Sequence, residues 1–394
     1  MATQSNGEMW AEVKRLRGAG EAERAIGVLE QLCAAAPSEP RFLICMGELQ
    51  LQQGRLPEAG LWLERTRAAR PKDPAQLELL GRLELRQRLG SLAAAGDCDG
   101  VVATYHEVVR ADPDRVRRVE DWAPLVNHAG EARYARAGER VGPAGLSVIR
   151  EVLTRGIAVR SLAEITGEAG LLDGLQRVAR ETRDWTVPGK PHFFKAIREE
   201  DAEPSHPVLR AGLHPALLEI ANGFYGLHSR LVSANIVQTR VDASADRVRR
   251  GSEGWHRDPE DTPMFKAFIY LNDVEALEHG PFQYVPDSRP GRRYEPLMPR
   301  FGRGRYDPSY KTKPDPEQAD REIDPSDIVT MLGKAGTLFF CDTSGFHRGG
   351  YCLTQDRNMT TLVYQRPGSQ YPAYIRCEAP QGATLAQRLA VQPL

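Results

Sequence analysis

A glycine-to-proline spacing that recurs three times in the first third of the chain constrains its fold more than any other feature. The segments Gly20 to Pro37, Gly54 to Pro71 and Gly96 to Pro113 all span the same interval. A small or apolar residue stands five positions after each glycine, and a larger one nine positions after it (Ala25, Ala59 and Val101; Leu29, Leu63 and Tyr105). Small residues let two helices approach closely, and proline ends a helix. The pattern therefore predicts an array of helical hairpins.

The spacing of this array resembles that of the tetratricopeptide repeat. Gly47 and Gly81 are 34 residues apart, as are Gly20 and Gly54, and this is the period of that repeat. The step from Gly54 to Gly96 is 42 residues, which implies an insertion of eight near 86–95. The resemblance implies a repeat domain over residues 1–115. It would be either a concave surface for a peptide, a partner protein or a second copy of the chain, or a helical buttress.

Composition and charge exclude several classes of protein. Of the 394 residues, 41% are hydrophobic and 27% are charged, which favours a packed core over wholesale disorder. A formal net charge of −1 gives no global attraction to nucleic acid or anionic lipid. The six cysteines form no CxxC pair and indicate reduced thiols. No signal-peptide pattern or membrane-length apolar run is visible, so we expect a soluble, cytoplasmic protein with no nucleic-acid or membrane partner.

The remainder of the chain has the pattern of a β-rich domain. We expect a helical connector over 116–146, a domain over 147–380 and a C-terminal tail over 381–394. The segment 149–162 predicts a short helix and a strand, and 169–182 predicts an amphipathic helix. Further strands are predicted at 230–241, 265–271, 281–285, 336–341 and 359–365. The expected fold class is α+β multidomain: a helical repeat array, then a double-stranded β-helix, the jelly-roll or cupin-like barrel, with flanking helices.

Two short motifs in the second domain have the residue types of a metal site. The sequence GWHRD places His256 and Asp258 two residues apart, so both project to the same side of an extended strand. The sequence GTLFFCDTSGFHRGG places His347 just past a strand, and Arg357 follows ten residues later. Two histidines and one carboxylate leave three adjacent positions of an octahedral Fe(II) ion open for the 2-oxo acid of 2-oxoglutarate and for O2. The distal carboxylate of 2-oxoglutarate then suits an arginine fork.

These motifs resemble the phytanoyl-CoA dioxygenase family of iron(II)/2-oxoglutarate-dependent oxygenases. The resemblance runs from WHRD through FIYLNDV, HGPFQYVPDS and GTLFFCDTSGFHRGG to Arg357, within roughly residues 150 to 370. It implies that His256, Asp258 and His347 bind the iron and are catalytic. It also implies that Arg357 anchors 2-oxoglutarate, and that Gln238 touches this co-substrate, as in some members. The carboxylate at 258 favours hydroxylation or another two-electron oxidation such as desaturation, because related halogenases have a small residue there.

Several other residues near these motifs could have either a structural or a functional role. Lys266 lies in the middle of a predicted strand, where it either faces outward or contacts the co-substrate or substrate. Trp255 is interpreted as a packing residue rather than a platform for the substrate, and His192 and His279 as candidates to line a pocket. The family often has PGSH where this chain has Pro286-Asp287-Ser288-Arg289. That departure leaves the substrate contacts near this loop open.

The segment 287–313 combines eight basic residues with four aromatic ones. The basic residues are Arg289, Arg292, Arg293, Arg300, Arg303, Arg305, Lys311 and Lys313, and the aromatic ones are Tyr294, Phe301, Tyr306 and Tyr310. A charge run of this kind is usually a solvated surface. Alternatively, it is a lid whose arginines recognise an anionic substrate.

Together these features predict a non-haem iron(II)/2-oxoglutarate-dependent dioxygenase. We expect it to hydroxylate a small metabolite or natural-product intermediate, which is anionic if the basic segment 287–313 recognises it, with release of succinate and CO2. The alternatives are a peptide or protein hydroxylase whose substrate is recruited by the repeats, and an inactive interaction scaffold.

Overall fold

The structure is a computed structural model that describes residues 5–111, 123–182, 193–195, 202–242, 251–258, 260–297, 314–369 and 375–391. The chain divides into two compact units, Met1–Ala129 and Gly130–Leu394. Within the ranges described, no helix has both the length and the apolar character needed to cross a membrane.

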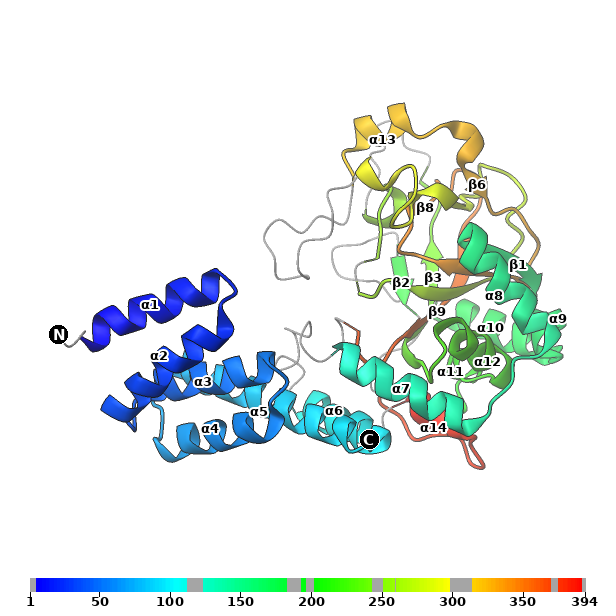
Figure 1. Cartoon of the computed structure of the whole chain (residues 1–394). Helices are drawn as coiled ribbons and strands as arrows, with labels where there is room; N and C mark the ends of the chain where they lie inside the picture. The colour runs from blue at the N-terminus through cyan, green and yellow to red at the C-terminus, as the bar shows by residue number, and fades with distance from the viewer. Residues whose placement is uncertain are drawn as a thin grey trace. The chain divides into compact units, whose positions relative to one another are not determined.

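The first unit consists of consecutive helices, which Figure 1 shows in blue to cyan. They are α1 (Asn6–Gly18), α2 (Ala22–Ala35), α3 (Pro40–Gln52), α4 (Leu56–Ala68), α5 (Pro74–Ala94) and α6 (Cys98–Ala111). Gly20, Gly54 and Gly96 lie at the turns inside the hairpins with φ of 75°, 72° and 73°. This left-handed conformation is readily adopted by glycine, which has no Cβ. The expectation of helical hairpins is confirmed.

The inserted residues of the third repeat lengthen its first helix. Helix α5 has 21 residues, whereas α1 and α3 have 13 each. The difference is eight, and the expected insertion near 86–95 falls at the C-terminal end of α5. The extra residues therefore extend a helix by about two turns.

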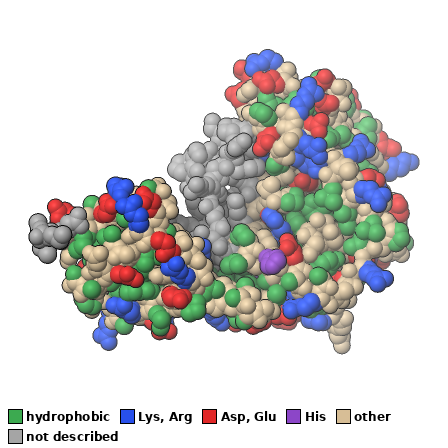
Figure 2. All heavy atoms as spheres, viewed as in Figure 1, with side chains coloured by type: hydrophobic (Ala, Val, Ile, Leu, Met, Phe, Trp, Pro, Cys, Tyr) green, Lys and Arg blue, Asp and Glu red, His purple; other side chains and the backbone are tan. Residues whose placement is uncertain are grey.

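Small residues allow close packing within the repeats. A Cβ on Gly47 would lie 2.8 Å from Leu63 Cδ2, so α3 and α4 pack closely at this point. The six residues that follow the repeat glycines at fixed spacing are all buried: Ala25, Leu29, Ala59, Leu63, Val101 and Tyr105. The visible surface of this unit carries basic and acidic side chains interspersed with one another (Figure 2).

The second unit contains two antiparallel sheets. The larger one has the strand order β1-β7-β4-β9-β3-β2, and the smaller one β6-β5-β8. The strands are β1 (Ile157–Ser161), β2 (Phe193–Lys195), β3 (Arg230–Thr239), β4 (Phe265–Tyr270), β5 (Phe282–Tyr284), β6 (Val329–Thr330), β7 (Thr337–Asp342), β8 (His347–Gly349) and β9 (Arg357–Gln365). From β4 to β9 the chain passes repeatedly between the sheets, as in a jelly roll. The predicted strands at 230–241, 265–271, 281–285, 336–341 and 359–365 are confirmed within a few residues.

Helices cover the outer face of the larger sheet (Figure 1). They are α8 (Pro143–Arg155), α9 (Leu162–Thr166), α10 (Gly170–Glu181), α11 (Pro207–Gly212), α12 (Pro215–Tyr225) and α14 (Leu385–Ala390), which supply most of the helical side chains in the core. Helix α7 (Ala123–Ala137) precedes them along the chain and spans the boundary between the two units. The amphipathic helix expected over 169–182 is α10. Between β5 and β6 lie η5 (Pro286–Ser288), η6 (Glu295–Leu297), α13 (Pro316–Glu322) and η7 (Pro325–Asp327).

The larger sheet is buried on both faces, and alternate residues face different cores. In β4, Phe265, Ala267 and Ile269 pack against the helices. Phe268 and Tyr270 instead pack between the sheets, where Phe268 contacts Phe282 of β5 with ring centroids 5.0 Å apart. Because side chains alternate along a strand, Lys266 also points between the sheets. This inner space is where the candidate site lies.

Candidate metal centre

The two motif histidines are held side by side by their own backbones. The His256 N–H donates to the His347 carbonyl at 3.1 Å, and the His347 N–H donates to the His256 carbonyl at 3.0 Å. This mutual pair places the two rings on the same side of the two segments, with centroids 4.1 Å apart. The pairing at His256 is an isolated bridge rather than a full strand, and His347 opens its own short strand, β8.

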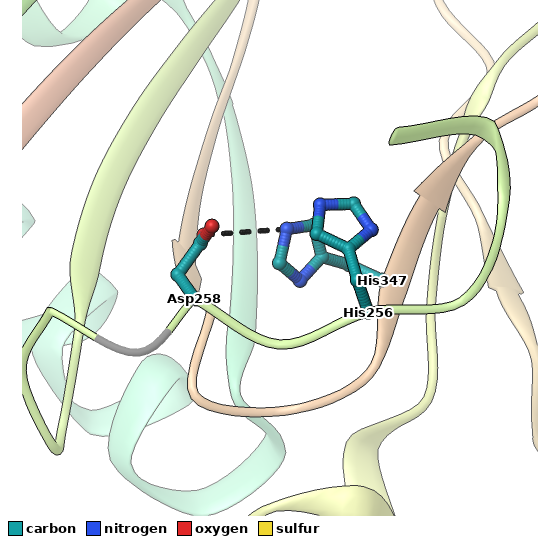
Figure 3. A group of neighbouring side chains, drawn as sticks. All are labelled: His256, Asp258 and His347. Atoms are coloured by element: carbon teal, nitrogen blue, oxygen red, sulfur yellow. Dashed lines mark ion pairs between the residues drawn. The ribbon is translucent and has the colours of Figure 1, made fainter. Parts of the chain in front are cut away.

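Asp258 completes a group of three possible metal ligands (Figure 3). Its backbone N–H donates to the Thr343 carbonyl at 3.0 Å, which fixes the segment beside the turn before β8. Its Oδ2 lies 3.3 Å from His347 Nε2. One potential ligand atom from each of the three residues lies within 4.8 Å of the others. The sequence expectation that these residues come together is met by the geometry.

Both imidazole rings are oriented by backbone carbonyls. His256 Nδ1 lies 2.9 Å from the Gly254 carbonyl, and His347 Nδ1 lies 3.0 Å from the Gly345 carbonyl. A carbonyl can only accept, so each Nδ1 carries a proton, and Nε2 is the atom of each ring through which a metal could bind. Burial, reinforced by the neighbouring His347, lowers the pKa of His256 to about 3. The His256 ring is therefore neutral and able to ligate.

A lysine ammonium stabilises the ionised form of Asp258. Lys266 Nζ lies 2.6 Å from Asp258 Oδ2, and both side chains are 14% exposed. Burial acts to raise the pKa of Asp258, but Lys266 and then His347 outweigh it and hold that pKa well below its usual value. The Asp258 carboxylate is thus charged and available as a ligand.

Arg357 lies on the inner face of β9, on the same side as Met359 of the core between the sheets. The side chain is 4% exposed; its Nη1 donates to the Gly280 carbonyl and its Nη2 to Thr239 Oγ1 at 3.1 Å. Its Nε makes no hydrogen bond to any described residue, and no described carboxylate forms an ion pair with it. The guanidinium is therefore a buried cation without a described counter-ion.

The smaller sheet brings this guanidinium near the histidines. A Cβ on Gly349 would lie only 2.8 Å from Arg357 Nη2. Gly349 and His347 are two residues apart in β8, a distance of about 7 Å along a strand, and alternate residues share a face. Arg357 thus lies about one strand repeat from His347, in the same inner space.

The structure does not bring Gln238 to this group. Gln238 follows Ala234 and Ile236 on the helix-covered face of β3, and its Nε2 donates to the Ala179 carbonyl of α10. Together with Gln176, Arg180 and Asn358 it lines a separate cavity of about 300 Å³. Lys266, by contrast, points inward, which excludes the outward-facing alternative.

The other residues singled out in the sequence have structural contacts. Trp255 is buried beneath the Arg348 guanidinium, which lies 4.1 Å from the ring centroid. His279 Nδ1 accepts a hydrogen bond from the Glu275 N–H at 3.2 Å. His192 lies outside the described residues, as do the loop residues Arg300, Arg303, Arg305, Lys311, Lys313, Phe301, Tyr306 and Tyr310.

Sequence reasoning missed the arginines that alternate with the ligands. Arg257 and Arg348 follow His256 and His347 and are 1% and 9% exposed. Arg257 lies 4.4 Å from the Phe346 ring centroid, in a cation–π contact like that of Arg348. The available signal was strand alternation: a residue next to an inward ligand faces the opposite side.

Arg289, which replaces the histidine of the family motif, caps a helix. Its Nη1 donates to the carbonyls of Val152 at 3.2 Å and Leu153 at 3.0 Å, and its Nη2 to that of Thr154 at 2.7 Å. These carbonyls end helix α8, where the helix dipole favours a cation.

We predict that Arg289→Ala lowers the free energy of unfolding by about 2 kcal/mol, because it leaves three C-terminal carbonyls without a charged donor. Thermal unfolding measures the effect. Arg292→Ala, at an exposed neighbouring position, should leave the unfolding temperature unchanged. Equal effects of the two substitutions would contradict the capping role.

Comparison with known proteins gives one family match. The tetratricopeptide repeat family matches residues 16–83, so the N-terminal unit is a tetratricopeptide-like repeat. No curated protein matches the chain.

Part of the chain is similar to solved structures at low identity. One is the non-heme alpha ketoglutarate dependent epimerase SnoN from nogalamycin biosynthesis: 19% identity, 56% of this chain and 83% of that one covered, TM-score 0.39. A second is HygX from Streptomyces hygroscopicus with nickel, 2-oxoglutarate and hygromycin B bound: 18% identity, coverage 55% and 86%, TM-score 0.40. A third is AviO1 from Streptomyces viridochromogenes Tue57: 14% identity, coverage 59% and 98%, TM-score 0.41.

Proposed function

We propose that the second unit is an Fe(II)- and 2-oxoglutarate-dependent oxygenase that uses O2 to oxidise a small molecule. The observation that carries this proposal is the pairing of His256, Asp258 and His347 with a buried arginine that has no described counter-ion. A site for a metal alone does not require such a cation. A metal site that also binds a dicarboxylate does require a cation of this kind, to hold the second carboxylate.

The donor set fits iron(II). Two imidazole nitrogens and one carboxylate oxygen on one side of an ion leave three adjacent positions for a co-substrate and O2. When bound, the iron would supply the redox chemistry that couples oxidative decarboxylation of 2-oxoglutarate to substrate oxidation. Gly254 and Gly345 would keep both Nε2 atoms directed at it through their Nδ1–H hydrogen bonds.

Arg357 would bind the distal carboxylate of 2-oxoglutarate. Its planar fork offers parallel hydrogen bonds to a carboxylate. Thr239, which accepts from Nη2, and the Gly280 carbonyl, which accepts from Nη1, hold the guanidinium in place. The strand step from His347 to Gly349 separates the metal end of this space from the arginine end, as a five-carbon dicarboxylate requires.

Aromatic side chains would limit access of water to the site. The Phe282 ring stacks on His347 with centroids 5.6 Å apart and an angle of 26° between the rings. Phe282 also contacts Phe268 and Phe339, at 5.0 and 5.2 Å. This cluster forms an apolar wall beside His347, and such a wall would limit the access of solvent to the reacting groups.

The proposed substrate is a small metabolite or natural-product intermediate, and the proposed reaction is its hydroxylation. We further propose that the substrate carries an anionic group, which the basic side chains of the segment 287–313 would recognise. Succinate formation tests this. Purified protein with Fe(II), 2-oxoglutarate and O2 should release succinate slowly alone and faster with a true substrate. Absence of succinate under all conditions, from folded protein with bound iron, would contradict the proposal.

The tetratricopeptide-like repeat supports a second candidate function, in which the first unit recruits a peptide or protein to be hydroxylated. We predict that a chain starting at about residue 120 keeps Fe(II) and 2-oxoglutarate binding, because every proposed ligand lies beyond residue 250. Comparison of its kcat/KM with that of the full chain distinguishes the two functions. An unchanged value for a small substrate favours the first, and a selective loss with a peptide substrate favours the second.

A further inference from the structure

Lys266 occupies an unusual place for a lysine, inside the barrel and against a proposed metal ligand. It lies in the second position of β4, in register with Cys341 of β7 and Val363 of β9, so backbone surrounds it on both sides. Its side chain is 14% exposed and its ammonium is 2.6 Å from Asp258 Oδ2. A buried ammonium needs such a partner, because removal from water costs several kcal/mol.

The carboxylate oxygen that Lys266 contacts is the one that faces the histidines. Asp258 Oδ2 is 2.6 Å from Lys266 Nζ and 3.3 Å from His347 Nε2. A divalent ion shared by Asp258 and His347 would therefore approach the oxygen that already carries the ammonium. Two cations on one largely buried oxygen repel each other more strongly than they would in bulk water.

Four described charged groups, Asp258, Glu260, Lys266 and Arg357, sum to zero, so a divalent metal would need an accompanying dianion to keep the charge of this group at zero. Asp258 and Glu260 both act electrostatically on Lys266, and they contribute two negative charges. Lys266 and Arg357 contribute two positive charges. A divalent metal alone would leave the site at +2, and 2-oxoglutarate with its two carboxylates would return it to neutrality.

We propose that Lys266 is a positioning residue that makes metal binding depend on the co-substrate. This inference rests on the proposed function and extends it. Lys266 is the counter-ion of Asp258 in the metal-free protein and opposes binding of the metal alone. When 2-oxoglutarate binds, its negative charge offsets the ammonium, so the metal and the dianion bind together more tightly than either binds alone.

Calorimetric titration of the full chain with Ni²⁺, with and without 2-oxoglutarate, tests the proposal without turnover. The variants are Lys266→Met, the charge-conserving Lys266→Arg, and Lys334→Met as a control at an exposed lysine. Lys266→Met should bind Ni²⁺ at least tenfold more tightly without 2-oxoglutarate, which corresponds to about 1.4 kcal/mol. The factor by which 2-oxoglutarate tightens Ni²⁺ binding should fall at least tenfold. The other two variants should behave as the wild type.

The possible results separate this inference from the proposed function. Wild-type protein that binds neither Ni²⁺ nor 2-oxoglutarate would contradict both. Wild-type protein that binds both, with the same Ni²⁺ affinity or the same coupling factor in Lys266→Met, would overturn only the role of Lys266. Lys266→Gln provides the same comparison if Lys266→Met does not fold, because it removes the charge and keeps a polar group.

Discussion

Replacement of Asp258 by alanine is expected to lower turnover by roughly a thousandfold or more, because the metal loses its only carboxylate ligand in the described site. His256→Ala and His347→Ala should have effects of the same order. The measurement is succinate formation at saturating 2-oxoglutarate, together with iron content after dialysis. The rate of succinate formation and the iron content should both fall in these variants.

The Asp258 variant needs a control for stability. Without Asp258, the Lys266 ammonium loses its nearest counter-ion, so Asp258→Ala alone should also lower the free energy of unfolding, by about 3 kcal/mol. The double variant Asp258→Ala/Lys266→Met removes both charges and should recover stability but not turnover. An active Asp258→Ala enzyme, or activity restored by the double variant, would show that Asp258 is not a ligand.

Arg357→Lys is expected to raise the KM for 2-oxoglutarate at least about tenfold before kcat falls, because lysine keeps the charge but lacks the two-point fork. Initial rates of succinate formation over a range of 2-oxoglutarate concentrations measure this. Arg357→Leu, which removes the charge as well, should have the larger effect. An unchanged KM in both variants would show that another group binds the distal carboxylate.

Gly349→Ala provides an independent test of the same contact. The added Cβ would lie 2.8 Å from Arg357 Nη2, so the guanidinium must move although its charge remains. The φ of Gly349 is outside the left-handed region, so alanine does not strain the backbone there. We expect a raised KM for 2-oxoglutarate with nearly unchanged kcat. Gly170→Ala, where nothing lies within 4 Å of the new Cβ, is the matched control.

Local patterns predicted the helices, the strands and the grouping of His256, Asp258 and His347, because those features depend on short sequence motifs. The eight-residue insertion was visible from glycine spacing alone and became the extra length of α5. The two-residue separation of His256 and Asp258 was enough to place both on one side of an extended segment. The partner His347 was found by its motif, although its own strand, β8, is only three residues long.

Features that depend on which face of a sheet is inward could not be predicted. Strand alternation puts Gln238 on the same face as Ile236, but both faces of β3 are buried, so hydrophobicity does not distinguish the barrel interior from the helix side. A bulge between Leu231 and Ser233 shifts the alternation further. For the same reason, the sequence alone allowed Lys266 to face outward. The structure shows that the helices cover the opposite face of β4, so Lys266 points between the sheets.

Contacts between residues far apart in the sequence could not be predicted either, because no local sequence pattern indicates them. Arg289 lies more than 130 positions from the carbonyls that it caps at the end of α8. Its replacement of a family histidine therefore suggested a change at the substrate, whereas the structure gives it a role in holding a helix. The smaller sheet similarly brings Gly349 against Arg357 without any pattern that relates the two.

We propose that one site binds a metal through His256, Asp258 and His347 and a dicarboxylate through Arg357. Equilibrium binding of 2-oxoglutarate without O2, with and without Fe(II), tests it most directly, because no substrate needs to be known. We predict tight binding only when Fe(II) is present, loss of the Fe(II) effect in Asp258→Ala, and weaker binding in Arg357→Lys. Binding of equal strength with and without Fe(II), unaffected by either substitution, would contradict the claim.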